Sequence, residues 1–121
     1  MKWYVDSIFR EIATTINEIE NNLLLIEDEE SSAARYARQG AVIGDERWQS
    51  INERKNKLEK QKSVLEFLKF QLHKHYTPIN SNKERVFYQE IIEKEVIKKL
   101  ASEENFEGCI IVKEFMKQFN R

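Results

Sequence analysis

Residues 5–37 read VDSIFREIATTINEIENNLLLIEDEESSAARYA, and this stretch decides the fold. Its apolar side chains recur at alternating spacings of four and three residues. Side chains at that spacing share one face of an α-helix, so the pattern predicts a long helix with a coiled-coil seam. The seam consists of Val5, Phe9, Ile12, Ile16, Ile19, Leu23, Ile26, Ala33 and Ala37, with Glu30 as a polar interruption.

A second long helix is predicted after Gly40 and Gly44, because glycines at this spacing indicate a turn near residues 39–45. Asp45 is expected to cap the new helix. Two of its seam positions carry lysine, so this seam is too thin to hold a long coiled coil by itself. The apolar seam residues are Trp48, Ile51, Leu58, Leu65, Leu68 and Leu72.

Charge is distributed unevenly along the chain, although the formal net charge is only −1. Residues 1–34 carry a net charge of −6, residues 35–74 carry +5, and the remainder is balanced. Folding the two helices back about residue 42 places the acidic run 27–30 opposite Arg54, Lys55 and Lys57, and Ala33 and Ala37 opposite Trp48 and Ile51. A parallel pairing of two chains would align like charges, so an antiparallel hairpin within one chain is favoured. A hairpin exchanged between two chains is the alternative.

The remaining residues predict two shorter helices. Pro78 ends the second long helix, and Ser81 with Glu84 forms a capping box that opens a third. The segment 107–119 is predicted as a fourth helix by its apolar spacing. The fold class is therefore a single all-α domain over residues 1–121, with a hairpin over 1–76 and a C-terminal helical pair over 79–121. The third helix carries a broad apolar arc of Phe87, Tyr88, Ile91, Ile92, Val96 and Leu100.

Several apolar side chains lie off the hairpin seam, and we expect the two C-terminal helices to cover those near the base. These are Trp3, Tyr4, Ile8, Val64, Phe67 and Phe70. The part of the hairpin over residues 27–57 should then project as a polar stalk. Surplus apolar side chains at Leu24, Leu25, Phe87 and Ile91 are assigned to an oligomerisation or docking surface, and a homodimer is expected.

Common catalytic and metal-binding motifs are missing from the sequence. His73 and His75 should point away from each other on a helix and so could not share a metal ion. Cys109, the single cysteine, is expected to be a buried thiol in a reducing compartment. No stretch resembles a signal peptide or a bilayer-spanning helix. We therefore expect a cytoplasmic protein with no catalytic residue, cofactor, metal ion or membrane partner.

One cluster at the hairpin turn is a candidate site for a partner: Arg35, Tyr36, Arg38, Arg47 and Trp48. Arginine and aromatic side chains are enriched where proteins bind each other, and they also contact phosphates and stack on bases. A purely structural role, in which the arginines balance nearby acidic groups, is the third interpretation. The leading hypothesis is a non-enzymatic protein-binding protein, a regulator, inhibitor or complex subunit of the kind that phages and other mobile elements carry. The alternative is a nucleic-acid-binding accessory protein.

Overall fold

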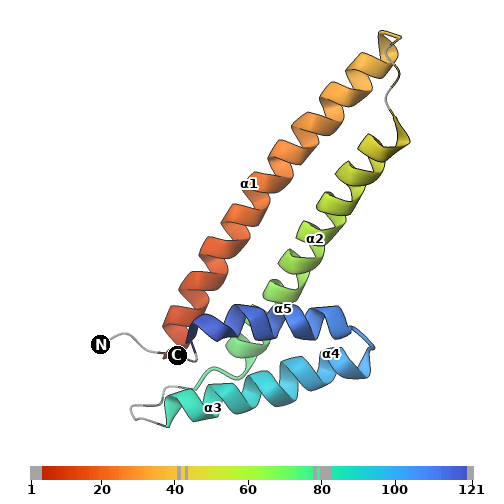
Figure 1. The fold of residues 1–121 in the computed structure, drawn as a ribbon. Coiled ribbons are helices and arrows are strands. Elements are labelled where there is room, and N and C mark those ends of the chain that lie inside the picture. The colour runs from red at the N-terminus through yellow and green to blue at the C-terminus, as the bar shows by residue number, and fades with distance from the viewer. Residues whose placement is uncertain (1–3, 41, 43, 78, 80–82, 120–121) are drawn as a thin grey trace.

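The fold is a long helical hairpin with a helical base, as seen in a computed structural model that describes residues 4–40, 42, 44–77, 79 and 83–119. Helix α1 (Tyr4–Arg38) and helix α2 (Asp45–Lys74) run antiparallel, and the C-terminal helices pack across their lower ends (Figure 1). No strand occurs among the described residues. The all-α hairpin architecture predicted from the sequence is confirmed.

Three ion pairs between α1 and α2 fix the register of the hairpin. They join Arg54 Nη2 to Glu29 Oε1 at 2.9 Å, Lys55 Nζ to Glu30 Oε2 at 3.9 Å, and Lys62 Nζ to Glu20 Oε1 at 3.3 Å. The midpoint of each pair in the sequence lies within one residue of 42, as the charge pattern predicts. All six side chains are at least partly exposed, so each pair stabilises the hairpin by at most about 1 kcal/mol. The apolar layers must supply most of the stability.

The apolar layers are unevenly distributed along the hairpin. The distal half, farther from the chain termini, has a small cluster of three buried residues, Ile26, Ala33 and Ile51, with Trp48 packed against it. Burying one large aliphatic side chain is worth roughly 1.5–3 kcal/mol, so most of the packing energy lies at the base. The base cluster contains Val5, Ile8, Ile12, Ile19, Val64, Leu65, Leu68, Leu72, Tyr88, Ile92, Val96, Leu100, Cys109, Val112 and Met116.

The C-terminal helices cover most of the off-seam side chains near the base, as expected. Ile8 and Val64 are buried, and Tyr4 and Phe67 pack against the base cluster, whereas Phe70 stays exposed. Trp3 lies outside the described residues. At the other end of the hairpin, the expected packing of Ala37 is wrong. Ala37 is exposed, because the distal cluster reaches no farther than Ala33 on α1.

The start of α2 differs from the sequence-based expectation. Gly44, with φ −66° and ψ 148°, is the N-cap of α2 and makes no side-chain cap bond, so Asp45 is not the cap. Asp45 and Glu46 instead lie in the first turn, where their negative charges favour the helix dipole.

Glu84, expected in a capping box of its own helix, caps a different one. Its buried carboxylate accepts a hydrogen bond from the Val5 backbone N–H at 3.0 Å, at the start of α1. A helix start has backbone N–H groups without partners inside the helix, and a carboxylate there also favours the helix dipole. Glu84 thus ties the first helix to the third. Ser81, the other half of the predicted box, lies outside the described residues.

A π-helical segment interrupts the third helix. Helix α3 (Glu84–Ile91), the π-helix η1 (Ile92–Ile97) and α4 (Lys98–Ser102) follow one another directly and form one rod. In an α-helix, each step of four residues overshoots a full turn by about 40°. The π-turn holds more residues, so it removes this drift. The buried apolar residues of the rod are therefore spaced four apart and still share one face: Tyr88, Ile92, Val96 and Leu100.

The turn into the last helix is closed by backbone hydrogen bonds. Asn105 N–H donates to the Leu100 carbonyl at 2.8 Å and Glu104 N–H donates to the Ala101 carbonyl at 3.0 Å, which is a Schellman motif. Asn105 Oδ1 then accepts a hydrogen bond from the Gly108 N–H at 2.9 Å and caps α5 (Phe106–Met116). A short 3₁₀ helix, η2 (Lys117–Phe119), continues α5.

Glu104→Gly should stabilise the protein by about 1 kcal/mol, because Glu104 has a φ of 59° at the position where helices most often have glycine. Urea unfolding followed by circular dichroism would measure the gain. Glu103→Gly is the matched control, since Glu103 has a φ of −89° and gains nothing from glycine. Equal effects of the two substitutions would contradict the prediction.

Candidate interaction surfaces of the hairpin

The predicted tip residues divide into an exposed group and one structural residue. Arg35, Tyr36 and Arg38 lie in the last turns of α1, and Arg47 lies in the first turn of α2. All four are exposed. Trp48 is half-buried and packs on the distal cluster, so it holds the hairpin together at this end. Val42, in the loop between the helices, is 96% exposed and adds an apolar side chain to the tip.

The exposed arginines of the tip are not held by the neighbouring acidic side chains. Among the described residues, the acidic run forms its ion pairs with Arg54 and Lys55, and Arg35, Arg38 and Arg47 form none. The hydrogen bond from Arg54 is the main reason why the pKa of the Glu29 carboxyl is lowered, and the charge of Arg47 has a smaller effect. The structural role considered for these arginines therefore lacks the expected pairs.

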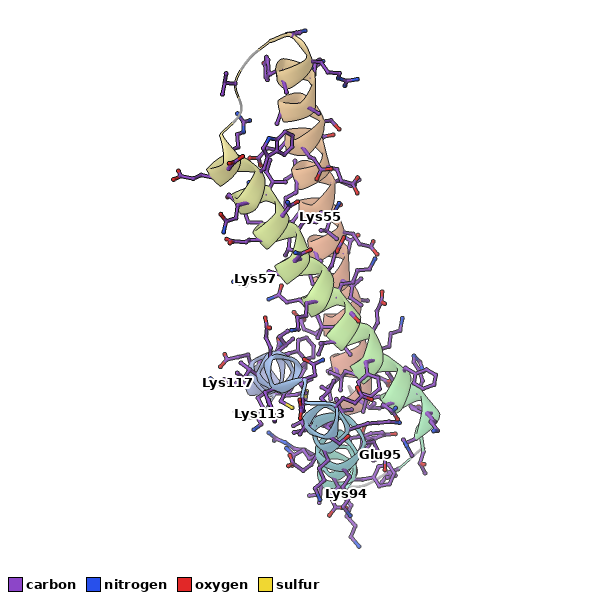
Figure 2. All side chains as sticks on the ribbon, turned by 90° about the vertical axis from the view of Figure 1, so that its right-hand side faces the viewer. Lys55, Lys57, Lys94, Glu95, Lys113 and Lys117 are labelled. Atoms are coloured by element: carbon purple, nitrogen blue, oxygen red, sulfur yellow. The ribbon has the colours of Figure 1, made fainter. Side chains whose placement is uncertain are left out.

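A groove runs between α1 and α2 near the middle of the hairpin, where the stalk joins the base, and we call it the stalk groove. Its volume is about 440 Å³. In Figure 2, Lys57 lies on the same side of the hairpin as α5, which is marked by Lys113 and Lys117, whereas Lys55 lies on the other side. The groove therefore opens on the α5 side. Its lining residues are Asn22, Leu25, Ile26, Arg54, Lys57, Leu58 and Gln61.

The two sides of the stalk differ in charge pairing. On the Lys55 side, basic residues of α2 are paired with glutamates of α1. On the groove side, Arg54 is paired with Glu29, but Lys57 has no ion pair in the described part of the chain, although the sequence placed it opposite the acidic run. The α1 residues that line the groove beside it are Asn22, Leu25 and Ile26, and Leu25 is 66% exposed. This side therefore combines an unpaired cation with an uncovered leucine.

The four residues assigned to an oligomerisation or docking surface do not lie together. Leu24 and Leu25 are exposed on α1, but Leu24, at 59% exposure, is not part of the groove. Phe87 and Ile91 belong to α3 and pack against the base cluster, partly buried. Most of the apolar surplus expected on α3 is thus used inside the fold.

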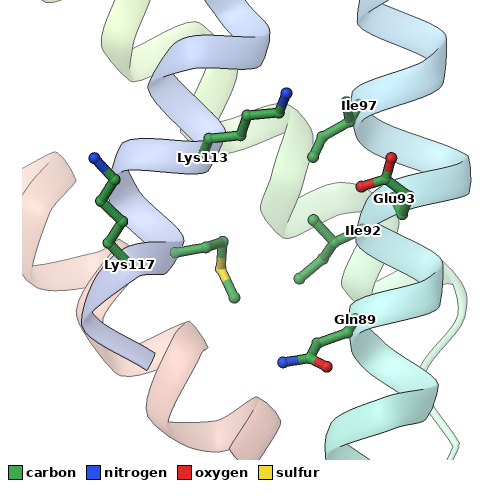
Figure 3. A pocket seen from close by; sticks show the side chains of 7 residues that line it. Gln89, Ile92, Glu93, Ile97, Lys113 and Lys117 are labelled. Carbon is green, nitrogen blue, oxygen red and sulfur yellow. The ribbon is translucent and has the colours of Figure 1, made fainter. Parts of the chain in front are cut away.

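A second cavity lies in the base, between the α3–η1 rod and α5 (Figure 3). It has a volume of about 500 Å³. Buried Ile92 and Met116 form its floor, and Lys117 at its rim is paired with Glu114 at 2.7 Å. The sequence pattern did not reveal this cavity, because its shape depends on the π-turn. Its lining residues are Gln89, Ile92, Glu93, Ile97, Lys113, Met116 and Lys117.

The histidines and the cysteine occupy separate environments. His73 stacks on Phe9 with ring centroids 4.2 Å apart, and His75 Nε2 lies 3.9 Å from the Glu95 carboxylate. Cys109 is buried, with its Sγ 3.4 Å from the Ile97 carbonyl oxygen. Within the described residues, no group of three or more His, Cys, Asp or Glu side chains could hold a metal ion. None of the helices described is both long and apolar enough to cross a bilayer.

Comparison with known proteins gives no match: no family model, no curated protein and no solved structure is similar to the chain. The molecule is therefore characterised by its geometry. It is an all-helical hairpin protein with a densely packed base and a thinly packed distal half that carries the exposed tip and the stalk groove.

Proposed function

We propose that the chain acts by binding another protein through the distal half of its hairpin. The proposal is based on three exposed side chains, Leu25, Tyr36 and Val42, in the half of the hairpin whose core has three buried residues. Exposed apolar and aromatic side chains next to arginines are typical of protein interfaces. A partner that covers this surface would complete the packing that the hairpin lacks. In this role the protein is a regulator, an inhibitor or a complex subunit rather than an enzyme.

A photo-crosslinking phenylalanine analogue placed at position 25 or 36 tests this proposal in cells of the native host. Covalent adducts with another protein are expected at both positions. Asn52, exposed on α2 and outside the groove, is the control position and should give no adduct. Without an adduct at either position, or with equal adducts at position 52, the proposal is wrong.

The homodimer expected from the sequence remains a prediction of its own. Phe87 and Ile91 pack within the base, so of the four residues assigned to the dimer interface only Leu24 and Leu25 are exposed. Sedimentation velocity at micromolar concentration measures it directly. A single monomeric species would rule the dimer out and would leave binding to another protein unaffected.

Binding of nucleic acid at the tip is the second candidate function. Arg35 and Arg38 line a shallow cavity of about 470 Å³ with Ser31, Ser32 and Asp28, all on α1. Unpaired arginines beside hydroxyl groups can contact phosphates. Fluorescence anisotropy with a labelled single-stranded oligonucleotide should then show binding that weakens steeply with salt. The same affinity for the Arg35→Ala/Arg38→Ala variant, or no binding at low salt, would exclude this function.

A further inference from the structure

We infer that the stalk groove binds an acidic amphipathic helix of the partner protein. This inference rests on the proposed function and specifies the chemistry of the partner. It follows from the shape of the groove, from its apolar floor and from the unpaired Lys57 at its edge.

The shape of the groove fits a helix. The groove lies between two antiparallel helices and extends over residues 22–26 and 54–61, about two helical turns. Toward the tip it reaches the Arg54–Glu29 ion pair, and toward the base it approaches the Lys60–Glu107 ion pair at 2.7 Å, where α5 begins. Side-chain ridges of a third helix fit into the groove between two packed helices.

The floor of the groove is apolar, so a partner helix would contact it with aliphatic side chains. Ile26 is buried, Leu58 is half-buried, and Leu25 is two-thirds exposed at the edge. An amphipathic helix with leucine-type side chains at spacings of three and four would cover all three residues. Covering them would extend the distal core, which now ends in water on this side.

The positive charge at the rim of the groove favours the binding of an acidic helix. Arg54 and Lys57 stand on the α2 edge, and the α1 edge offers Asn22 and Leu25 instead of a carboxylate. Arg54 is occupied by Glu29, so Lys57 is the cation that a partner carboxylate can pair with. A basic helix would add repulsion at Lys57. A neutral helix would leave the ammonium group without a partner beside a newly covered apolar floor.

Three synthetic helical peptides test the inference. They share one leucine heptad pattern and carry Glu, Gln or Lys at the flanking positions. Fluorescence anisotropy at low salt should show the Glu peptide binding up to about fivefold more tightly than the Gln peptide, and the Lys peptide more weakly still. Leu25→Asp should abolish binding of the Glu peptide. Lys57→Glu should weaken the Glu peptide by roughly tenfold and strengthen the Lys peptide.

Lys69→Glu provides the matched control, because Lys69 is an exposed lysine of α2 outside the groove and the substitution changes the net charge equally. Equal binding of the three peptides, no binding at all, or equal effects of Lys57→Glu and Lys69→Glu would overturn the inference. An adduct from position 25 to a second copy of this chain would overturn it as well. An adduct to a different protein whose crosslinked segment lacks acidic residues would end the inference and leave the proposed function standing. Failure to crosslink at positions 25 and 36 would instead end the proposed function.

Discussion

Leu68→Ala should lower the free energy of unfolding by about 2–5 kcal/mol. Leu68 is fully buried in the base cluster, where α1, α2 and the C-terminal helices meet. The cavity left by the smaller side chain is enclosed on all sides, so the surroundings can collapse only partly. Urea unfolding followed by circular dichroism at 222 nm would measure the loss.

The comparison that makes this prediction specific is Ile51→Ala in the distal cluster. Ile51 is also fully buried, but its cluster has only two other buried members and Trp48 at its edge. Solvent and the Trp48 ring can fill part of the cavity that Ile51→Ala leaves. The free energy of unfolding should therefore fall by an amount near the lower limit of about 2 kcal/mol. If Ile51→Ala cost more than Leu68→Ala, the base would not be the main source of stability.

Deletion of Lys94 should leave the fold intact and change the free energy of unfolding by less than about 1 kcal/mol. Lys94 is exposed in the middle of the π-helix (Figure 2). Its removal shortens one of the four-residue intervals between the buried residues Tyr88, Ile92, Val96 and Leu100 to three. The resulting 4-3-4 spacing is the one that a regular α-helix places on a single face. The rod should therefore become α-helical throughout and keep the same core contacts.

Deletion of Ala13 is the contrasting case, because Ala13 is equally exposed but lies in the regular α-helix α1. Its removal turns the seam residues before it by about 100° relative to those after it. Ile8 and Ile12 could then not share the base cluster with Ile19, and the loss should exceed about 4 kcal/mol. Similar losses for the two deletions would contradict the packing argument for the π-turn.

The hairpin and its register could be predicted from sequence because both follow from local periodicity and from charge. The heptad pattern of α1 identifies the face that packs on α2. The acidic α1 and the basic α2 then bring opposite charges together in one antiparallel alignment. The observed pairs of Glu20, Glu29 and Glu30 agree with that alignment. The two C-terminal helices were predictable from their apolar spacing for the same reason.

Features that depend on contacts between distant segments were not predictable from periodicity. Ile8 lies off the seam and is nevertheless fully buried, because it faces the C-terminal helices rather than α2 alone. The Glu84 carboxylate accepts a hydrogen bond from the Val5 backbone N–H at the start of α1, although the two residues are 79 positions apart in the sequence.

The candidate site was predicted only in part, again because distant contacts shape it. The tip arginines follow from composition near the turn. The stalk groove does not, because it depends on the side of the hairpin that Lys57 faces and on the asymmetric pairing around it.

Amide hydrogen exchange of the isolated protein, measured by mass spectrometry, tests the central claim that a stable base presents a thinly packed binding arm. Exchange reports the free energy of local opening, which falls where few buried contacts hold a helix. We expect strong protection in residues 8–19, 64–72 and 88–100 and markedly weaker protection in 27–38 and 47–57. Equal protection along both arms of the hairpin would contradict it.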